Sequence, residues 1–141
     1  MRPLPRTEHP LVIRTDYSDA LAWARITAAI QRPHPAWGFT AQVQIMDDPS
    51  FDGLSRDDIV RLAKPEYHLS FLFIVDQQAV KRKDHACLAV DIRKKREFRV
   101  IPSEVWGVEN NLSLGNMDWT DFANWVDQSD TFRGFPIPRD R

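Results

Sequence analysis

Apolar residues recur along the chain in two periods, one typical of strands and one typical of helices. Continuous or alternating apolar runs predict strands at residues 11–15, 39–46, 69–75, 87–92 and 98–101. The run at 69–75 is the most apolar of them, so we expect it to be buried on both faces of a sheet. The charged residues between the last two runs make a gap of hairpin length.

Helices are predicted where apolar residues repeat every three or four positions. Stripes of this kind predict helices at about residues 19–31, 55–64, 103–114 and 119–126. The second of them begins with a capping box, because Ser55 and Asp58 have the required spacing of three residues. Gly115 is placed to end the third helix.

The order of these elements predicts the fold class. Strands and helices alternate over the first half of the chain, which favours parallel pairing with right-handed crossovers. We therefore expect one α/β domain with a mixed, mostly parallel sheet of about five strands and about four helices. This domain should span residues 11–135, after a loose leader at 1–10 and before a tail at 136–141.

The charge of the chain is balanced, since 19 Lys and Arg face 20 Asp and Glu and the net charge is -1. Basic residues cluster at 81–83 and at 93–96, which flank one predicted strand and so lie at its opposite ends. We therefore expect neither nucleic acid nor a membrane surface among the partners.

The single cysteine, Cys87, lies in an apolar run, which is typical of a buried thiol in a reducing compartment. The first ten residues contain three prolines and two arginines without an apolar stretch, so they do not resemble a signal peptide or an anchor. No apolar run is long enough to span a membrane. These features predict a cytoplasmic protein.

Four carboxylates, Asp16, Asp47, Asp48 and Asp76, each follow a predicted strand. The ends of parallel strands share one edge of an open sheet, where ligands usually bind. Asp16, Asp48 and Asp76 could then act as acids and bases, or could take up a divalent cation that neutralises them. Aspartates in such positions also cap helices and begin turns, so both interpretations stay open. No organic cofactor is expected, because the chain lacks a glycine-rich phosphate loop.

A stretch rich in Trp and Asn, residues 101–119, follows the last predicted strand. Trp106, Glu109 and Asn110 share one helical face, and Asn111 lies beside them. These side chains could face a ligand, or they could form a satisfied polar network at a corner between helices. We expect the indole of Trp106, like that of Trp119, to be largely buried.

The loop at 32–38 carries His34 and Trp37 and could supply the rim of such a site. A tryptophan in a short loop also folds back onto the core in many proteins, which is the alternative for Trp37. Both residues are therefore candidates for binding, and His34 is also a candidate for an acid–base role in the enzyme alternative.

The string at residues 104–118, Glu-Val-Trp-Gly-Val-Glu-Asn-Asn-Leu-Ser-Leu-Gly-Asn-Met-Asp, resembles the signature of a family of small microbial proteins that is a domain of unknown function. Shorter matching pieces lie at 11–16, 47–49, 73–76 and 132–135, so the resemblance spans about residues 11–135. It implies no activity and gives no residue a role.

Two functions from different classes are consistent with these features. The first is a small binding or interaction module, whose Trp- and Asn-rich end takes a small molecule or a protein partner. The alternative is a small enzyme of the isomerase or hydrolase type, with Asp16, Asp48, Asp76 and Glu109 in acid–base roles. A deep pocket with a carboxylate of raised pKa at its base would favour the enzyme, and an aromatic surface patch would favour the module.

Overall fold

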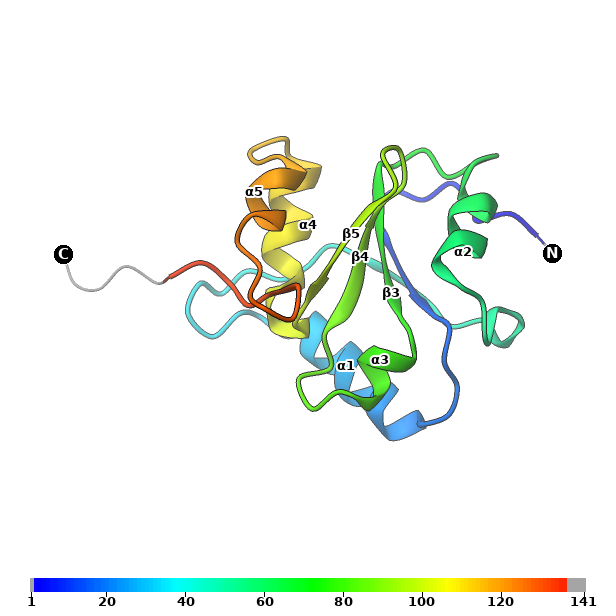
Figure 1. Ribbon diagram of the computed structural model, residues 1–141, viewed down its shortest axis with the longest axis horizontal. Helices are drawn as coiled ribbons and strands as arrows, with labels where there is room; N and C mark the ends of the chain where they lie inside the picture. The colour runs from blue at the N-terminus through cyan, green and yellow to red at the C-terminus, as the bar shows by residue number, and fades with distance from the viewer. Residues whose placement is uncertain (1, 137–141) are drawn as a thin grey trace.

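The computed structural model describes residues 2–136 and shows one six-stranded sheet between two layers of helices (Figure 1). The order across the sheet is β2-β1-β3-β4-β5-β6, with parallel pairs at β1–β2, β1–β3 and β5–β6 and antiparallel pairs at β3–β4 and β4–β5. The strands are β1 (Leu11–Arg14), β2 (Gln44–Met46), β3 (Phe71–Val75), β4 (Cys87–Asp91), β5 (Arg96–Val100) and β6 (Thr131–Phe132).

Helices cover both faces of this sheet, as Figure 1 shows for α2 on one side and for α4 and α5 on the other. They are α1 (Ala20–Gln31), α2 (Arg56–Ala63), α3 (Gln77–Lys81), α4 (Val105–Ser113) and α5 (Trp119–Ala123), with 3-10 turns η1 (Pro49–Phe51) and η2 (Pro102–Glu104). The predicted capping box at Ser55 and Asp58 is present at the start of α2. Among residues 2–136, no helix is both long and apolar enough to cross a membrane.

The predicted α/β class, the single domain and the mixed sheet are confirmed. Two elements were not predicted, the five-residue helix α3 and the two-residue strand β6, because both are too short to show a period. The predicted strand at 39–46 was too long: only Gln44–Met46 pair with a neighbour, and residues 39–43 run irregularly toward it.

The core divides into two clusters because side chains of a strand point alternately to opposite faces. In β3, Phe71 and Phe73 point toward the side of α1, α4 and α5, whereas Leu72 and Ile74 point toward α2. Every residue of β3 is buried, as the apolar run predicted. Each fully buried side chain of this size contributes about 1.5–3 kcal/mol to the free energy of unfolding.

The residues expected to form a loose leader are partly packed on the domain. Leu4 is fully buried in the cluster that contains α2, and its backbone N–H donates a hydrogen bond to the carbonyl of Leu62 at 2.8 Å. The leader was therefore not loose at this position, because a leucine between two prolines still has an apolar side chain to bury. Of the predicted tail, residues 137–141 lie outside the described residues.

Candidate functional site

Three segments that are far apart in the sequence enclose a small aromatic cavity of about 250 Å³, which we call the aromatic pocket. The loop before β2, the start of α4, and the segments α5 and β6 with the residues after them supply its walls. Its lining residues are Trp37, Phe39, Glu104, Trp106, Gly107, Asn111, Phe122, Phe132 and Phe135. Six of these nine are aromatic, so the walls offer mainly the faces and edges of rings.

Local backbone bonds hold the loop that supplies the outer wall. The N–H of His34 donates to the carbonyl of Phe39 at 2.9 Å, and the N–H of Gly38 donates to the carbonyl of His34 at 2.7 Å. Gly38 has φ +75, a conformation that glycine adopts without strain. This closed loop places Phe39 against the indole of Trp106, with ring centroids 5.4 Å apart and planes tilted by 26°.

The carboxylate of Glu104 is the polar group of the pocket lining that carries a charge. Its Oε2 lies 2.6 Å from Nε2 of His34, and both side chains are largely buried, with exposed fractions of 13% and 8%. Nδ1 of His34 accepts the backbone N–H groups of Ala36 and Trp37 at 3.1 and 3.3 Å. Since Nδ1 accepts, the ring proton is on Nε2, and His34 is a neutral donor to the carboxylate.

The Glu104–His34 pair therefore has a net charge of about -1 and is a hydrogen bond rather than an ion pair. Burial raises the pKa of Glu104, and the hydrogen bond from His34 opposes this rise without cancelling it. The second oxygen, Oε1, makes no hydrogen bond to the described residues. Gly134 leaves the space for it, because a Cβ at that position would lie only 2.7 Å from Oε1.

Trp106 is partly buried and packs against the core on the side of α1, α4 and α5, so it is less enclosed than Trp119. Its indole packs against Phe39 and lies 5.3 Å from the His34 ring, and its Nε1 is buried without an acceptor among residues 2–136. A helical stripe cannot reveal this, because the partners of Trp106 come from a loop about 70 residues earlier. Trp119, with 6% exposed, is buried as predicted, and its ring centroid lies 4.7 Å from that of Phe98.

Glu109, a predicted catalytic residue, is buried in a satisfied polar network. Its carboxylate accepts hydrogen bonds from the backbone N–H of Gln42 at 2.6 Å, from Nδ2 of Asn110 at 2.7 Å and from Oγ of Ser113 at 2.8 Å. These three donors hold α4 against the chain before β2. Glu109 and Asn110 border another cavity, of about 470 Å³, but their hydrogen bonds are directed to the protein.

Asn111 also bonds to the protein, since its Nδ2 donates to the carbonyl of Gly107 at 2.8 Å. Both Asn111 and Gly107 line the aromatic pocket, so this bond closes part of its wall. Of the predicted binding residues, Trp37, Trp106 and Asn111 thus surround one pocket, and His34 supports its carboxylate. Asn110 lies elsewhere, in the network around Glu109.

The carboxylates at the strand ends do not form the predicted metal site. Asp16 accepts from the backbone N–H of Ser18, and Asp48 accepts from both the N–H and the hydroxyl of Ser50. These bonds to Ser50 lower the pKa of Asp48. Over residues 2–136 there is no group of three His, Cys, Asp or Glu side chains that could hold a metal ion. Asp16, Asp48 and Asp76 accept hydrogen bonds within their own turn or helix cap, which is the alternative that the sequence left open. Asp47 accepts instead from the hydroxyl of Tyr17 and from Arg14.

Asp76 shows most clearly why the strand-end interpretation failed. Its carboxylate accepts from the N–H of Ala79 and so caps α3, a helix that was not predicted. The same carboxylate forms two bonds with the guanidinium of Arg99, at 2.8 and 2.7 Å. Arg99 is buried in β5. An arginine at an inward position of a predicted strand needs a carboxylate partner, so Arg99 was the residue in the sequence that could have indicated the role of Asp76.

Sequence reasoning missed Glu104, Phe39 and Phe135 as members of the site. Glu104 lies at the start of the predicted helix at 103–114, where an acidic residue is common and indicates no site. Phe39 was placed in the predicted strand at 39–46, and Phe135 follows the last predicted element. Their common role depends on tertiary contacts that no local pattern contains.

Residues 9–135 match the family model of a domain of unknown function, DUF6924. The match covers nearly the whole described chain and confirms the resemblance to a domain of unknown function over about residues 11–135. A search of the curated proteins found no match. Any function must therefore be argued from the chemistry of the pocket itself.

Proposed function

The chain belongs to the DUF6924 family, a domain of unknown function, and from its geometry we propose that it is a binding module for small organic cations. The ligand group would be a quaternary or alkylated ammonium seated in the aromatic pocket. It would belong either to a small molecule or to a side chain of a protein partner. The observation that carries the proposal is the anionic Glu104–His34 pair beneath aromatic walls.

Both parts of the pocket favour a positive charge. The faces of aromatic rings carry negative potential, and a cation within about 6 Å of a ring centroid gains about 0.5–2 kcal/mol. Glu104 adds a formal charge that the neutral His34 does not cancel. A partly buried carboxylate without a cationic partner is costly to maintain, and a bound cation would offset that cost.

The size of the pocket limits the ligand group. Its volume of about 250 Å³ is below the roughly 300–1,000 Å³ of pockets that enclose whole drug-sized ligands. We therefore expect one ammonium head group to enter while the rest of the ligand stays outside. Trp37 and Phe39 are exposed and would contact this outer part.

The acid–base enzyme remains the second candidate for one reason, the raised pKa of Glu104 at the pocket floor. Glu104 is, however, the sole titratable side chain among the described residues that line this pocket. An acid–base cycle commonly needs a second group to return the proton. None of the strand-end aspartates lines the pocket, and His34, which is hydrogen-bonded to Glu104, does not line it either. The binding module is therefore the better-supported function.

Choline and its neutral isostere 3,3-dimethylbutan-1-ol test the proposal directly, because the two differ in charge but hardly in shape. Titration of the protein with each, followed by tryptophan fluorescence and calorimetry, should show choline binding about tenfold tighter or more. Glu66→Gln is the matched control variant, since Glu66 is exposed on the α2 side, and it should bind choline like the wild type. Equal affinity for the two compounds, or binding of neither, would refute the proposal.

We also propose that the protein is cytoplasmic and binds neither nucleic acid nor membranes. The balanced charge supports this, as does the buried Cys87 thiol, whose pKa burial raises to about 12. Such a thiol does not react readily and needs no oxidising compartment.

A further inference from the structure

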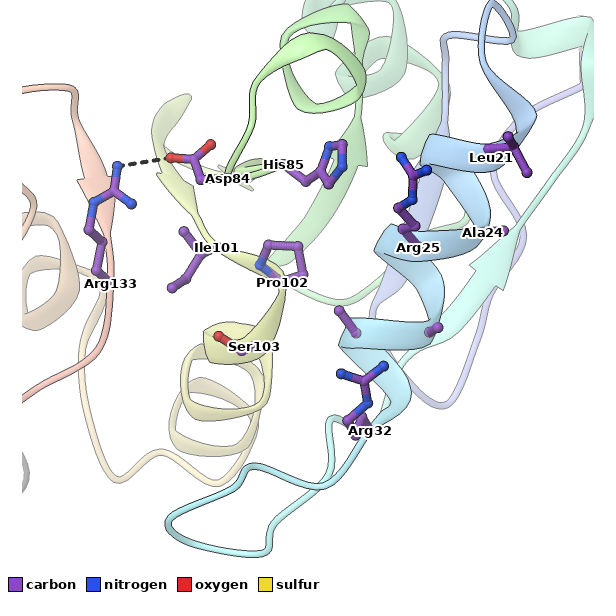
Figure 2. Close-up of a pocket in the computed structure, with 12 residues that line it drawn as sticks. Leu21, Ala24, Arg25, Arg32, Asp84, His85, Ile101, Pro102, Ser103 and Arg133 are labelled. Carbon is purple, nitrogen blue, oxygen red and sulfur yellow. Dashed lines mark hydrogen bonds and ion pairs between the residues drawn. The ribbon is translucent and has the colours of Figure 1, made fainter.

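A third cavity, of about 710 Å³, lies between α1 and the segments that face it, and we call it the basic groove (Figure 2). It shares no lining residue with the aromatic pocket. Figure 2 shows α1 along one side, with Pro102 and Ser103 of η2 and the Asp84–Arg133 pair on the other. The lining residues are Leu21, Ala24, Arg25, Ala28, Ala29, Arg32, Asp84, His85, Ile101, Pro102, Ser103 and Arg133.

The face of α1 that borders the groove is apolar and small. The opposite face of the helix is buried in the core, whereas Ala24 and Ala28 are exposed and Leu21 is 69% exposed. Alanines one turn apart leave room for another backbone to approach closely. Ile101 and Pro102 continue this apolar floor across the groove.

The rim of the groove carries positive charge that the protein does not neutralise. Arg25 and Arg32 are exposed and form no ion pair or side-chain hydrogen bond within the part of the chain that the structure describes. Arg133, in contrast, pairs with Asp84 at 2.8 Å and with Asp127 at 2.6 Å. Three arginines against one aspartate leave the lining with two net positive charges, on a chain whose net charge is -1.

We propose that the basic groove is a docking surface for an acidic amphipathic helix of a partner protein. Arg25 and Arg32 are seven residues apart, about 10 Å along the axis of α1, so they lie on nearly the same side of the helix. Glutamates seven residues apart on a facing helix repeat with the same spacing and pair with both arginines. Apolar residues between those glutamates contact Ala28 and Ala29, and apolar residues beyond the glutamate at Arg25 contact Leu21 and Ala24. This is a mode in which a helix lies in a groove.

A helical peptide with Leu positions on one face and two Glu seven residues apart is the probe, and the same peptide with Gln in place of Glu is its control. Fluorescence anisotropy of the labelled peptides should show binding of the Glu peptide that weakens as salt is added. Arg25→Ala and Arg32→Ala should each weaken binding about two- to fivefold, and the double variant about tenfold. Arg61→Ala, an exposed arginine on α2, is the matched control and should change nothing.

Ala28→Glu gives a second measurement that does not depend on removing an arginine. The site is exposed, so the variant should melt like the wild type, but its carboxylate should repel the Glu peptide and weaken binding about tenfold or more. Equal binding of the Gln peptide, or full binding by the Arg25/Arg32 double variant, would overturn the proposal. So would complete competition by acetate or phosphate alone, which indicates a simple anion site, or self-association of the protein through this face. Glu104→Gln should leave peptide binding intact, so the two proposals fail separately.

Discussion

Replacing Glu104 by glutamine removes the charge of the aromatic pocket and keeps its shape. The amide oxygen of glutamine still accepts the hydrogen bond from Nε2 of His34, so the pocket floor should stay in place. At about 4 Å and an effective dielectric constant of about 20, a carboxylate and a cation attract each other by roughly 4 kcal/mol. Most of this is offset by the water that both groups lose. We expect a net loss of about 1–2 kcal/mol, or roughly 5–30-fold in the Kd for choline.

The same variant should not lose stability at neutral pH. Because burial raises the pKa of Glu104 in the folded protein above its usual value of 4.5, ionising this group weakens the folded state as pH rises. Below pH 4.5 the carboxyl is protonated in both states and this cost is absent. The melting temperature of Glu104→Gln should therefore equal or exceed that of the wild type near neutral pH, and the advantage should shrink as pH falls toward 4.5.

Melting curves by circular dichroism across this pH range, paired with choline titrations, measure both effects on the same samples. Glu66→Gln again controls for the loss of one negative charge. If Glu104→Gln melted well below the wild type at neutral pH and still bound choline normally, Glu104 would be a structural residue, and the reasoning from its charge would be wrong.

Three other substitutions test the assignments of structural residues. In a denaturant titration, Trp119→Ala should lower the free energy of unfolding by about 3–5 kcal/mol, since its ring is buried against Phe98. Trp106→Ala should lower the free energy of unfolding by less and should abolish choline binding. Asp76→Asn should lower the free energy of unfolding by about 1–3 kcal/mol, because the charge-assisted bonds to Arg99 are weakened. Millimolar Mg²⁺ should not shift the melting temperature of the wild-type protein. A higher melting temperature for Asp76→Asn would instead restore the idea of repelling carboxylates.

The sequence was sufficient for the fold class because most core elements carry strong local periods. The apolar run ending at Val75 could only be a buried strand, and Ser55 with Asp58 marked a helix start within one residue. Strand-end aspartates carry no such information, because a carboxylate that caps its own helix and one that faces a ligand look alike in sequence. Asp76 illustrates this, since its partners are the backbone of α3 and an arginine two strands further along the sheet.

The aromatic pocket was only partly predictable for the same reason. The Trp- and Asn-rich stretch at 101–119 supplies Glu104, Trp106 and Asn111 to the pocket lining, whereas of the two loop candidates Trp37 lines the pocket and His34 is buried behind Glu104. The decisive contact joins His34 to Glu104 across 70 positions, and only the packing of α1 beside η2 brings them together. A site that depends on a contact between such distant positions can be identified in the folded structure, but not from the local pattern of residues in the sequence.

The edge strand β6 has a consequence for how ligand binding would be detected. It is only two residues long and pairs on one side with β5, yet Phe132 at its end and Phe135 just after it form one wall of the pocket. Phe132 is buried, so this wall is held by side-chain packing more than by the short backbone ladder. A ligand that contacts the two rings would add to that packing and stabilise the last pairing of the sheet. If the proposed cation binds, the backbone amide of Ile101, which donates to Phe132 across this edge, should therefore exchange hydrogen more slowly.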